Sequence, residues 1–214
     1  ENGAAIEDSL ATLRAFHHLG VRYLTLTHMQ ATTWADASTA PPRHNGLSDF
    51  GKSVVREMNR LGMMVDVSHV ADKTMSDVLD LSTAPIIASH SSARALAPHP
   101  RNIPDDLLKR IAKNGGVVMV NFYPAYIDPR TSIILEQLQP EIDALRKQWT
   151  NQPARFRAER RKLMENKLPV TPLSVVIDHI EHVIKVAGID HVGLGSDFDG
   201  ISIVFAMLLM RGGV

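Results

Sequence analysis

The sequence contains no cysteine, few aromatic residues and no excess charge of either sign. Without cysteine, disulfides and thiolate metal sites cannot form. A metal ion would have to be held by His, Asp and Glu, which suit Zn, Mn, Fe or Co. Lys plus Arg equals Asp plus Glu, at 23 each, and aromatic residues make up 5%. This composition argues against a phosphate-binding or base-stacking surface, so we expect no nucleic-acid partner.

The sequence also lacks an apolar run long enough to form a transmembrane segment. The run at 201–210 falls well short of the roughly 20 residues that a spanning helix needs, so we interpret it as helix or strand of a core. The chain starts at Glu1 and shows neither the charged nor the apolar part of a secretion signal. We therefore expect both ends to be those of a fragment. The compartment stays open between periplasmic, membrane-anchored and cytoplasmic.

Three apolar runs each end on a residue type that binds metal ions. The runs cover residues 63–69, 85–90 and 191–197. They end on His69, His90 and Asp197, and helical sequence separates them. Parallel strands that alternate with helices place all their carboxyl ends on one face, so two imidazoles and a carboxylate can meet in one pocket. This arrangement predicts a metal-dependent hydrolase.

The alternation of strands and helices continues along most of the chain. Further strands are predicted at 21–28 and 117–122, and helices at 6–19, 48–61, 72–81, 104–114 and 172–186. Ser48 and Asp72 have side chains that favour the N-terminal cap of a helix. Residues 29–46 are rich in Thr and Ala and contain two adjacent prolines, so they are predicted to form a long surface loop.

This order predicts an α/β fold built from βα units. A (β/α)8 TIM barrel is favoured over a doubly wound sheet, because polar residues end every strand and an open sheet would gather them near one switch point. Five strands are visible, so the barrel is expected to be incomplete, with N-terminal strands and the C-terminal end missing. We predict a single catalytic domain over 1–214, with a charged, exposed helical insertion at about 132–167.

Further polar residues lie near the same strand ends. His28 ends the first predicted strand and would be a metal ligand, a donor to a substrate oxygen or a structural residue. Arg101 lies one loop after His90, where its guanidinium would capture a carboxylate or stay solvated. Asp66 and the serines that precede the two histidines are candidate hydrogen-bond partners of the imidazoles. Strand alternation nevertheless places Asp66 on the face opposite to His69.

Five long segments resemble the membrane (renal-type) dipeptidase family, peptidase family M19. They are GVRYLTLTH, GLSDFGKSVVREMNRLGMMVDVSHV, APIIASHSSARALAPHPRNIPDD, GGVVMVNFYPAY and HVGLGSDFDG. The resemblance runs from Glu1 to about Gly200, and the charged insertion is more similar to bacterial members than to the mammalian enzyme. It implies a zinc-dependent metallodipeptidase that hydrolyses the peptide bond of dipeptides. It also implies a (β/α)8 barrel of the metallo-dependent hydrolase type with two zinc ions.

The resemblance assigns the metal ligands. Glu1 matches the glutamate that bridges the two zinc ions, and His69 and His90 match the histidines of the second zinc. The family holds its first zinc with a His-x-Asp pair on the first barrel strand, which has no counterpart in this sequence. One zinc site at most is therefore expected to be complete. The sequence after Gly200 also departs from the family pattern.

The resemblance assigns catalytic and substrate-binding roles as well. Asp197 matches the carboxylate that handles the proton of the attacking water, and His28 matches the histidine near the substrate carbonyl. Arg101 matches the residue that holds the C-terminal carboxylate of the substrate. Tyr126 is expected to line the same pocket.

Two other interpretations stay open. A truncated, inactive fragment that binds at most one metal would equally lack the His-x-Asp pair. A related amidohydrolase-type barrel hydrolase, acting on cyclic amides, would share the ligands at the strand ends. The sequence does not decide the preferred dipeptide, the physiological metal or whether the protein forms a homodimer.

Overall fold

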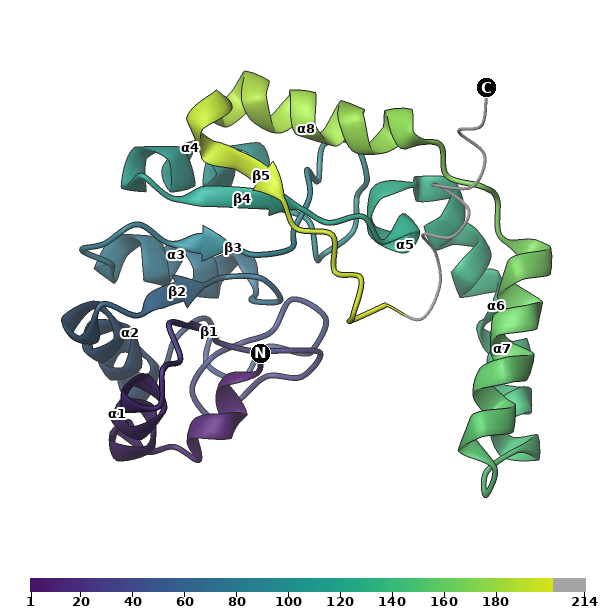
Figure 1. The fold of residues 1–214 in the computed structure, drawn as a ribbon, viewed down its shortest axis with the longest axis horizontal. Helices are drawn as coiled ribbons and strands as arrows, with labels where there is room; N and C mark the ends of the chain where they lie inside the picture. The colour runs from purple at the N-terminus through teal and green to yellow at the C-terminus, as the bar shows by residue number, and fades with distance from the viewer. Residues whose placement is uncertain (202–214) are drawn as a thin grey trace.

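The computed structural model describes residues 1–201, and its centre is a five-stranded parallel sheet (Figure 1). The strands are β1 (Tyr23–Thr25), β2 (Met64–Asp66), β3 (Ile87–Ala88), β4 (Val117–Val120) and β5 (Val192–Leu194). They pair in sequence order, and every pair is parallel. All five predicted strands are confirmed. Each is shorter than its apolar run, because the last residues of the run leave the sheet and enter the loop that follows.

The strand order distinguishes between the two predicted sheet architectures. The helices that accompany the sheet are α1 (Leu10–His18), α2 (Asp49–Leu61), α3 (Asp72–Leu81), α4 (Asp105–Asn114) and α8 (Leu173–Ala187). α1 packs on α2, α2 on α3, α3 on α4 and α4 on α8, so they form one continuous layer (Figure 1). A doubly wound sheet reverses its strand order, whereas a (β/α)8 barrel adds each strand in one direction. The predicted α/β fold of the barrel type is therefore confirmed.

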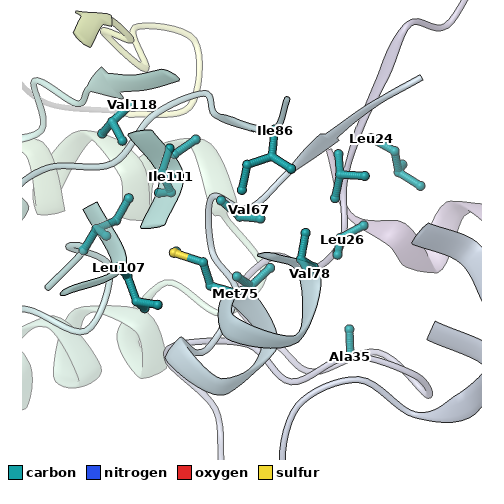
Figure 2. Close-up of a cluster of buried hydrophobic side chains, with 14 of the residues drawn as sticks. Leu24, Leu26, Ala35, Val67, Met75, Val78, Ile86, Leu107, Ile111 and Val118 are labelled. Carbon is teal, nitrogen blue, oxygen red and sulfur yellow. The ribbon is translucent and has the colours of Figure 1, made fainter. Parts of the chain in front are cut away.

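The hydrophobic core lies between the sheet and this helical layer. Val65, Ala88 and Val118 from three neighbouring strands are at most 1% exposed. They belong to the same cluster as Val78 of α3 and Ile111 of α4. Figure 2 shows Val118 of this cluster together with Val78 and Ile111. Burying one Val or Ile side chain contributes roughly 1.5–3 kcal/mol, so this layer fixes the strand ends and the loops that begin there.

Several helix boundaries follow the predicted local signals. The Ser48 hydroxyl accepts a hydrogen bond from the Gly51 amide at 3.2 Å, which confirms the predicted cap of α2. Gly62 and Gly115 end α2 and α4 with φ of 73° and 82°. This left-handed conformation costs glycine little, and it turns the chain from each helix into the next strand.

One predicted helix start and one predicted cap residue are wrong, although α3 begins at Asp72 as predicted. Residues Gly3–Ile6 form the 3-10 helix η1, and α1 begins at Leu10 behind the cap residue Ser9. The capping residue of α3 is Ala71, which makes no side-chain cap bond. Asp72 already lies within that helix, where its negative charge favours the positive N-terminal end.

The predicted surface loop at 29–46 is partly buried, with residues 34–37 packed against the molecule and residues 41–43 exposed to solvent. Asp36 is 1% exposed, and its carboxylate accepts a hydrogen bond from the Gly46 amide at 2.9 Å. The Ser38 amide donates to the carbonyl of His69 at 2.8 Å. Proline and threonine indicate irregular backbone but do not determine whether it is buried. The burial was not predictable, because backbone amides that bond to one carboxylate leave no pattern in the sequence. The loop therefore forms a wall beside His69.

The charged segment is helical, as predicted. The segment predicted at about 132–167 covers most of α6 (Pro129–Gln148) and all of α7 (Pro153–Lys167), and the short helix α5 (Pro124–Ile127) precedes it. α6 packs on α7, and the pair extends away from the sheet at the right of Figure 1. Its few buried side chains include Leu138, Ile142 and Met164. That this segment is an insertion in a single domain over 1–214 stays a prediction.

The remaining elements lie near the end of the described chain. The 3-10 helix η2 (Ile189–His191) leads into β5, and His191 Nδ1 lies 2.8 Å from the carbonyl oxygen of Gly116. Apart from Ile201, the helix or strand predicted at 201–210 lies outside the described residues. Within residues 1–201, no helix combines the length and the apolar character needed to cross a membrane.

Candidate active site

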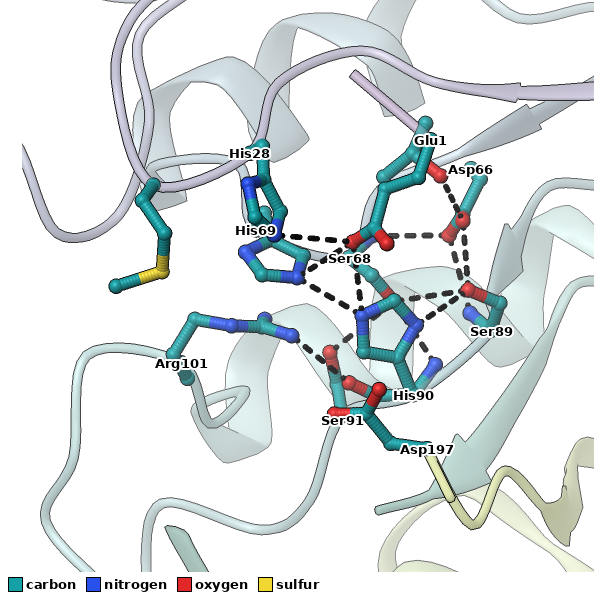
Figure 3. Close-up of polar contacts among 12 residues, drawn as sticks. Glu1, His28, Asp66, Ser68, His69, Ser89, His90, Ser91, Arg101 and Asp197 are labelled. Carbon is teal, nitrogen blue, oxygen red and sulfur yellow. Dashed lines mark hydrogen bonds and ion pairs between the residues drawn. The ribbon is translucent and has the colours of Figure 1, made fainter. Parts of the chain in front are cut away.

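Glu1, His69 and His90 come together beside the carboxyl ends of the strands, as Figure 3 shows. One potential ligand atom of each residue lies within 4.8 Å of the others. Glu1 Oε1 is 2.7 Å from His69 Nε2 and 3.2 Å from His90 Nε2, and the two imidazole nitrogens are 2.9 Å apart. Among residues 1–201, no other group of three His, Asp or Glu side chains has such spacing.

Each of these side chains is placed by the segment around it. His90 follows β3, and His69 lies just beyond β2 with φ of 68°, a left-handed conformation that is uncommon for residues other than glycine. The hydrogen bond from Ser38 to the His69 carbonyl holds this turn. Glu1 precedes η1, whose first turn is capped by the Asn2 side chain. Three separate segments therefore converge on one point.

The charge states of Glu1 and His69 suit a divalent cation. His69 and His90 are buried. Burial lowers the pKa of His69 to about 4, against the opposing effect of its hydrogen bond to Glu1, so the imidazole is neutral near pH 7. The hydrogen bond from His69 and the proximity of the His90 imidazole hold the pKa of Glu1 well below its usual range. Neutral imidazoles and an ionised carboxylate are typical zinc ligands, so the residues present fit a metal ion.

Asp66 lies close to His90, although strand alternation was expected to turn it away from His69. Because β2 ends at Asp66, the alternation does not extend to His69. The Ser89 hydroxyl is 2.6 Å from the Asp66 carboxylate and 2.8 Å from His90 Nδ1. Asp66 and Ser89 therefore form a hydrogen-bonded chain that ends on an imidazole of the cluster.

A cavity of about 280 Å³ opens beside the cluster. Its walls include Glu1, His28, His69, Tyr126, Arg160 and Asp197. The other two predicted site residues adjoin these walls, because His90 Nε2 lies 3.2 Å from Glu1 Oε1 and Arg101 donates to the His90 carbonyl (Figure 3). The structure thus gathers all seven predicted site residues around one cavity. A larger hollow of about 370 Å³ between α6 and α7 contains none of them.

Arg101 is buried, so the alternative of a solvated surface arginine is wrong. The residue is only 3% exposed. Its Nη2 donates a hydrogen bond to the His90 carbonyl at 3.1 Å. The guanidinium carbon lies 5.3 Å from the ring centre of Tyr126. Arg101 Nε is buried without a hydrogen-bond partner among the described residues. Burial lowers the pKa of Arg101, yet a guanidinium stays protonated near neutral pH, so the pocket keeps a positive charge.

His28 and Asp197 occupy two sides of the same cavity. His28 Nε2 is 3.8 Å from Glu1 Oε1, and its ring centre is 4.6 Å from that of His69. Asp197 lies beyond β5 with φ of 65°, and its Oδ2 accepts a hydrogen bond from Asn121 Nδ2 at 3.0 Å. Both side chains are therefore within the cavity that the cluster borders.

Three residues near the site were missed from the sequence. Asn121 directly follows β4, so the rule of a polar residue after an apolar run would have found it. Tyr123 lines the cavity and packs edge-on against Tyr126, with ring centres 4.8 Å apart. Arg160 reaches the cavity from α7, although its segment was predicted to be solvated. No local pattern distinguishes Arg160 from the other arginines of that helix.

Comparison with known protein families shows the family to which this chain belongs. The family model of peptidase family M19, described as membrane dipeptidase, matches residues 1–208. The chain belongs to the membrane dipeptidase family. A curated relative from Claviceps purpurea, named dipeptidase tcpJ, is 43% identical over 195 residues. The aligned region covers 91% of this chain and 37% of the relative.

Solved structures agree with the membrane dipeptidase assignment. The probable dipeptidase PvdM from Pseudomonas aeruginosa is 32% identical, with a TM-score of 0.77, and the match covers 92% of this chain and 56% of that one. A metallopeptidase from Rhodobacter sphaeroides, liganded with a phosphinate mimic of L-Ala-D-Ala, is 29% identical with a TM-score of 0.71. That match covers 95% of this chain and 50% of the other. The chain thus spans about half the length of these solved relatives.

Proposed function

We propose that this protein is a zinc-dependent dipeptidase, which hydrolyses the peptide bond of dipeptides. Membership of the membrane dipeptidase family supports the reaction class. The observation that carries the proposal is the contact between the Glu1, His69 and His90 cluster and the buried guanidinium of Arg101. The three metal ligands therefore lie next to Arg101, which can bind a substrate carboxylate.

Arg101 supplies the recognition of the substrate's end. A guanidinium pairs with a carboxylate through two parallel hydrogen bonds, and burial strengthens such a pair. The free C-terminal carboxylate of a dipeptide provides this partner, and Tyr126 packs beside the guanidinium. A cavity of about 280 Å³ has room for a short peptide only. The free carboxylate and the small volume together restrict the substrate to dipeptides.

The side chains around the cluster perform the proton transfers. When bound, a divalent ion would polarise the substrate carbonyl and acidify a water molecule. The Asp197 carboxylate accepts the proton of the attacking water and returns it to the leaving amine. Asn121 donates to Asp197 Oδ2, which leaves Oδ1 to carry that proton. His28 donates a hydrogen bond to the substrate carbonyl oxygen as negative charge develops there.

Zinc is the metal that we assign to the cluster. Catalytic zinc sites have three protein ligands from His and carboxylate side chains and keep one position open. The described residues gather one such set. The neutral state of His69 near pH 7 supports zinc, because an imidazole must be deprotonated to bind it.

A direct assay tests the proposal. The full chain, loaded with zinc, is incubated with Ala-Ala, Ala-D-Ala, C-terminally amidated Ala-Ala and a cyclic amide. We expect hydrolysis of the free dipeptides, its loss on chelation and its loss in His69→Ala. His18→Ala serves as the matched control, because His18 is exposed on α1.

Three outcomes would contradict the assignment. Turnover retained in His69→Ala would exclude the cluster from the reaction. Hydrolysis of the cyclic amide alone would favour an amidohydrolase. Zinc binding without turnover of any substrate would favour an inactive metal-binding chain.

A further inference from the structure

Asp66 is a fully buried carboxylate beneath the cluster, at 0% exposure. Its Oδ1 accepts hydrogen bonds from the amides of Ser68 and Ser89, each at 3.0 Å. Its Oδ2 accepts from the hydroxyls of Thr25 and Ser89, each at 2.6 Å. Four donors thus surround one carboxylate, and none of them is a cation. All of the hydrogen bonds to this buried carboxylate thus come from neutral donors, which are backbone amides and hydroxyls.

The hydrogen atoms in this network can be assigned by counting. An ionised carboxylate only accepts hydrogen bonds, and a serine hydroxyl has a single hydrogen. The Ser89 hydroxyl therefore gives its hydrogen to Asp66. Ser89 Oγ also lies 2.8 Å from His90 Nδ1, and in that contact it can only accept. His90 must then carry its hydrogen on Nδ1.

This assignment leaves the other imidazole nitrogen free. With the hydrogen on Nδ1, the lone pair of His90 Nε2 is directed at the space shared with Glu1 Oε1, 3.2 Å away, and His69 Nε2, 2.9 Å away (Figure 3). A metal ion binds the nitrogen that lacks hydrogen, and the hydrogen bond at the other nitrogen decides which one that is. The backbone amide of His90 is also held, because it donates to Ser68 Oγ at 2.9 Å.

His69 provides a contrast within the same cluster. Its Nδ1 is buried without a hydrogen-bond partner among the described residues. The Glu1 carboxylate, 2.7 Å from His69 Nε2, instead favours a hydrogen on that nitrogen in the absence of an ion, and no described group holds the hydrogen on Nδ1. The two histidines differ, and His90 is the one whose metal-binding nitrogen is set in advance.

We propose that Asp66 is a positioning residue, which acts through Ser89 to hold His90 in the Nδ1–H tautomer and so presents Nε2 to the metal ion. That Nε2 binds a metal ion rests on the proposed function. The assignment of the His90 tautomer rests only on the hydrogen bonds and is independent of it. Asp66 itself does not touch the ion or the substrate in this scheme. It joins β1, β2 and the start of the loop after β3 beneath the site.

Asp66→Asn tests the direction of the hydrogen bonds. The two backbone amides require an oxygen at the Oδ1 position, so the new amide NH₂ would occupy the Oδ2 position. That NH₂ donates to Ser89 Oγ, and Ser89 then gives its own hydrogen to His90 Nδ1. We expect the His90 tautomer to change from Nδ1–H to Nε2–H. Long-range ¹H–¹⁵N correlation spectra of the metal-free full chain report this directly, with His90 assigned through His90→Gln.

The zinc dissociation constant is the second readout, measured by competition with a chromophoric chelator. Asp66→Asn and Ser89→Ala should each weaken zinc binding by about 10–100-fold, the usual effect of removing such a partner. Both substitutions act through the contact between Ser89 and His90, so the double variant should bind zinc only slightly more weakly than either single variant. Thr25→Val is the matched control, because it removes the other hydroxyl from the same carboxylate oxygen. It should keep the Nδ1–H tautomer and change the dissociation constant less than about threefold.

The outcomes separate this proposal from the function proposed above. Nε2–H at His90 in the unmodified chain overturns the positioning role, whatever the activity. Equal weakening of zinc binding in all three single variants also overturns it, because the effect would then be general. If Asp66→Asn does not fold by circular dichroism, Ser89→Ala decides alone, and unchanged zinc binding there contradicts the proposal. Nδ1–H at His90 in a chain that binds no zinc would refute the proposed function and leave the hydrogen-bond assignment standing.

Discussion

At the scale of single residues, the site depends on a positive charge that the protein buries and only partly satisfies. Arg101 makes one hydrogen bond to the His90 carbonyl, while its Nε has no partner among the described residues. A buried guanidinium with unused donors is costly until a carboxylate arrives. Under the proposed function, the stabilisation gained at that moment would favour substrates with a free C-terminus. Arg101 would therefore select substrate length, and the cluster would perform the chemistry.

Arg101→Lys should selectively impair the hydrolysis of substrates with a free carboxylate. Lysine keeps the charge but cannot form the two parallel hydrogen bonds. We expect kcat/KM for Ala-Ala to fall about 10–100-fold, which corresponds to roughly 1.5–3 kcal/mol for hydrogen bonds to a charged group. The slow hydrolysis of the amidated dipeptide should not change. An equal fall for both substrates would contradict this role of Arg101.

Residue positions were predictable where a polar side chain ends an apolar run. His69, His90 and Asp197 follow such runs, and parallel packing brings these strand ends together. Asn121 obeys the same rule and was overlooked. Glu1 carries no local signal, because its place is set by η1 and by contacts with residues far along the chain, and only the family resemblance indicated it. That Asp66 and Ser89 are hydrogen-bond partners of an imidazole was predicted, and the chain from Asp66 to His90 confirms it. Which imidazole they contact was not predictable, since it depends on where β2 stops.

At the scale of elements, α7 contributes to a site that otherwise consists of loops at the strand ends. α7 belongs to the charged helical pair beyond the sheet, yet it carries Arg160 to the cavity wall. Helical periodicity and charge predicted the helices but not their packing, because the burial of Leu138 and Met164 accompanies the contact between α6 and α7. The helical pair therefore shapes the entrance of the cavity as well as the surface.

Arg160→Ala should weaken substrate binding without affecting the metal. Loss of a cation at the cavity wall reduces attraction for an anionic substrate, so we expect KM for dipeptides to rise about two- to tenfold with kcat nearly unchanged. Arg161→Ala is the matched control, because Arg161 pairs with Glu165 on the exposed surface of the same helix. A fall in zinc affinity in Arg160→Ala, or an equal KM effect in the control, would contradict the prediction.

An ion-pair network between α1 and α2 predicts how stability depends on pH. Glu57 is 8% exposed and is hydrogen bonded to Arg60 and to Arg14 of α1, at 2.7 and 2.5 Å. These hydrogen bonds lower the pKa of Glu57 from 4.5 to about 2. The stabilisation is therefore present above about pH 4.5 and is lost as the pH falls towards 2. Because both arginines are exposed to solvent, we discount its magnitude to about 1 kcal/mol.

Urea denaturation of Glu57→Gln measures this contribution. The free energy of unfolding should fall by about 1 kcal/mol at pH 7, and the difference from the unmodified chain should shrink as the pH is lowered from 4.5 towards 2. Asp49→Asn is a suitable control, because Asp49 is an exposed acid of the same helix. A constant difference across that pH range would show that the charge of Glu57 is not responsible.

At the scale of the whole molecule, the cluster connects parts of the chain that are distant in sequence. Glu1 precedes the first helical turn, whereas His69 and His90 follow neighbouring strands of the barrel-type sheet. The sequential strand order was predictable from the alternation of apolar runs and helices. The lengths of the strands and the packing of the loop at 29–46 were not, because both depend on contacts between elements. A bound ion would tie the start of the chain to the sheet.

Zinc should consequently stabilise the fold. At a free concentration of 100 times its dissociation constant, a ligand of the folded state contributes about 2.7 kcal/mol. For a chain of this size that corresponds to a rise in Tm of roughly 5–10 °C. A chelator should reverse the rise, and Glu1→Gln should reduce it. An equal rise in a His69→Ala, His90→Ala double variant would indicate that zinc binds elsewhere.

Anomalous X-ray diffraction at the zinc absorption edge, on crystals of the zinc-loaded full chain, tests the central claim most directly. We predict a peak bonded to a Glu1 carboxylate oxygen, His69 Nε2 and His90 Nε2, at about 2.0–2.2 Å from each. A well-occupied peak at other side chains, with these three atoms left without a bonded ion, would contradict the proposed metal site.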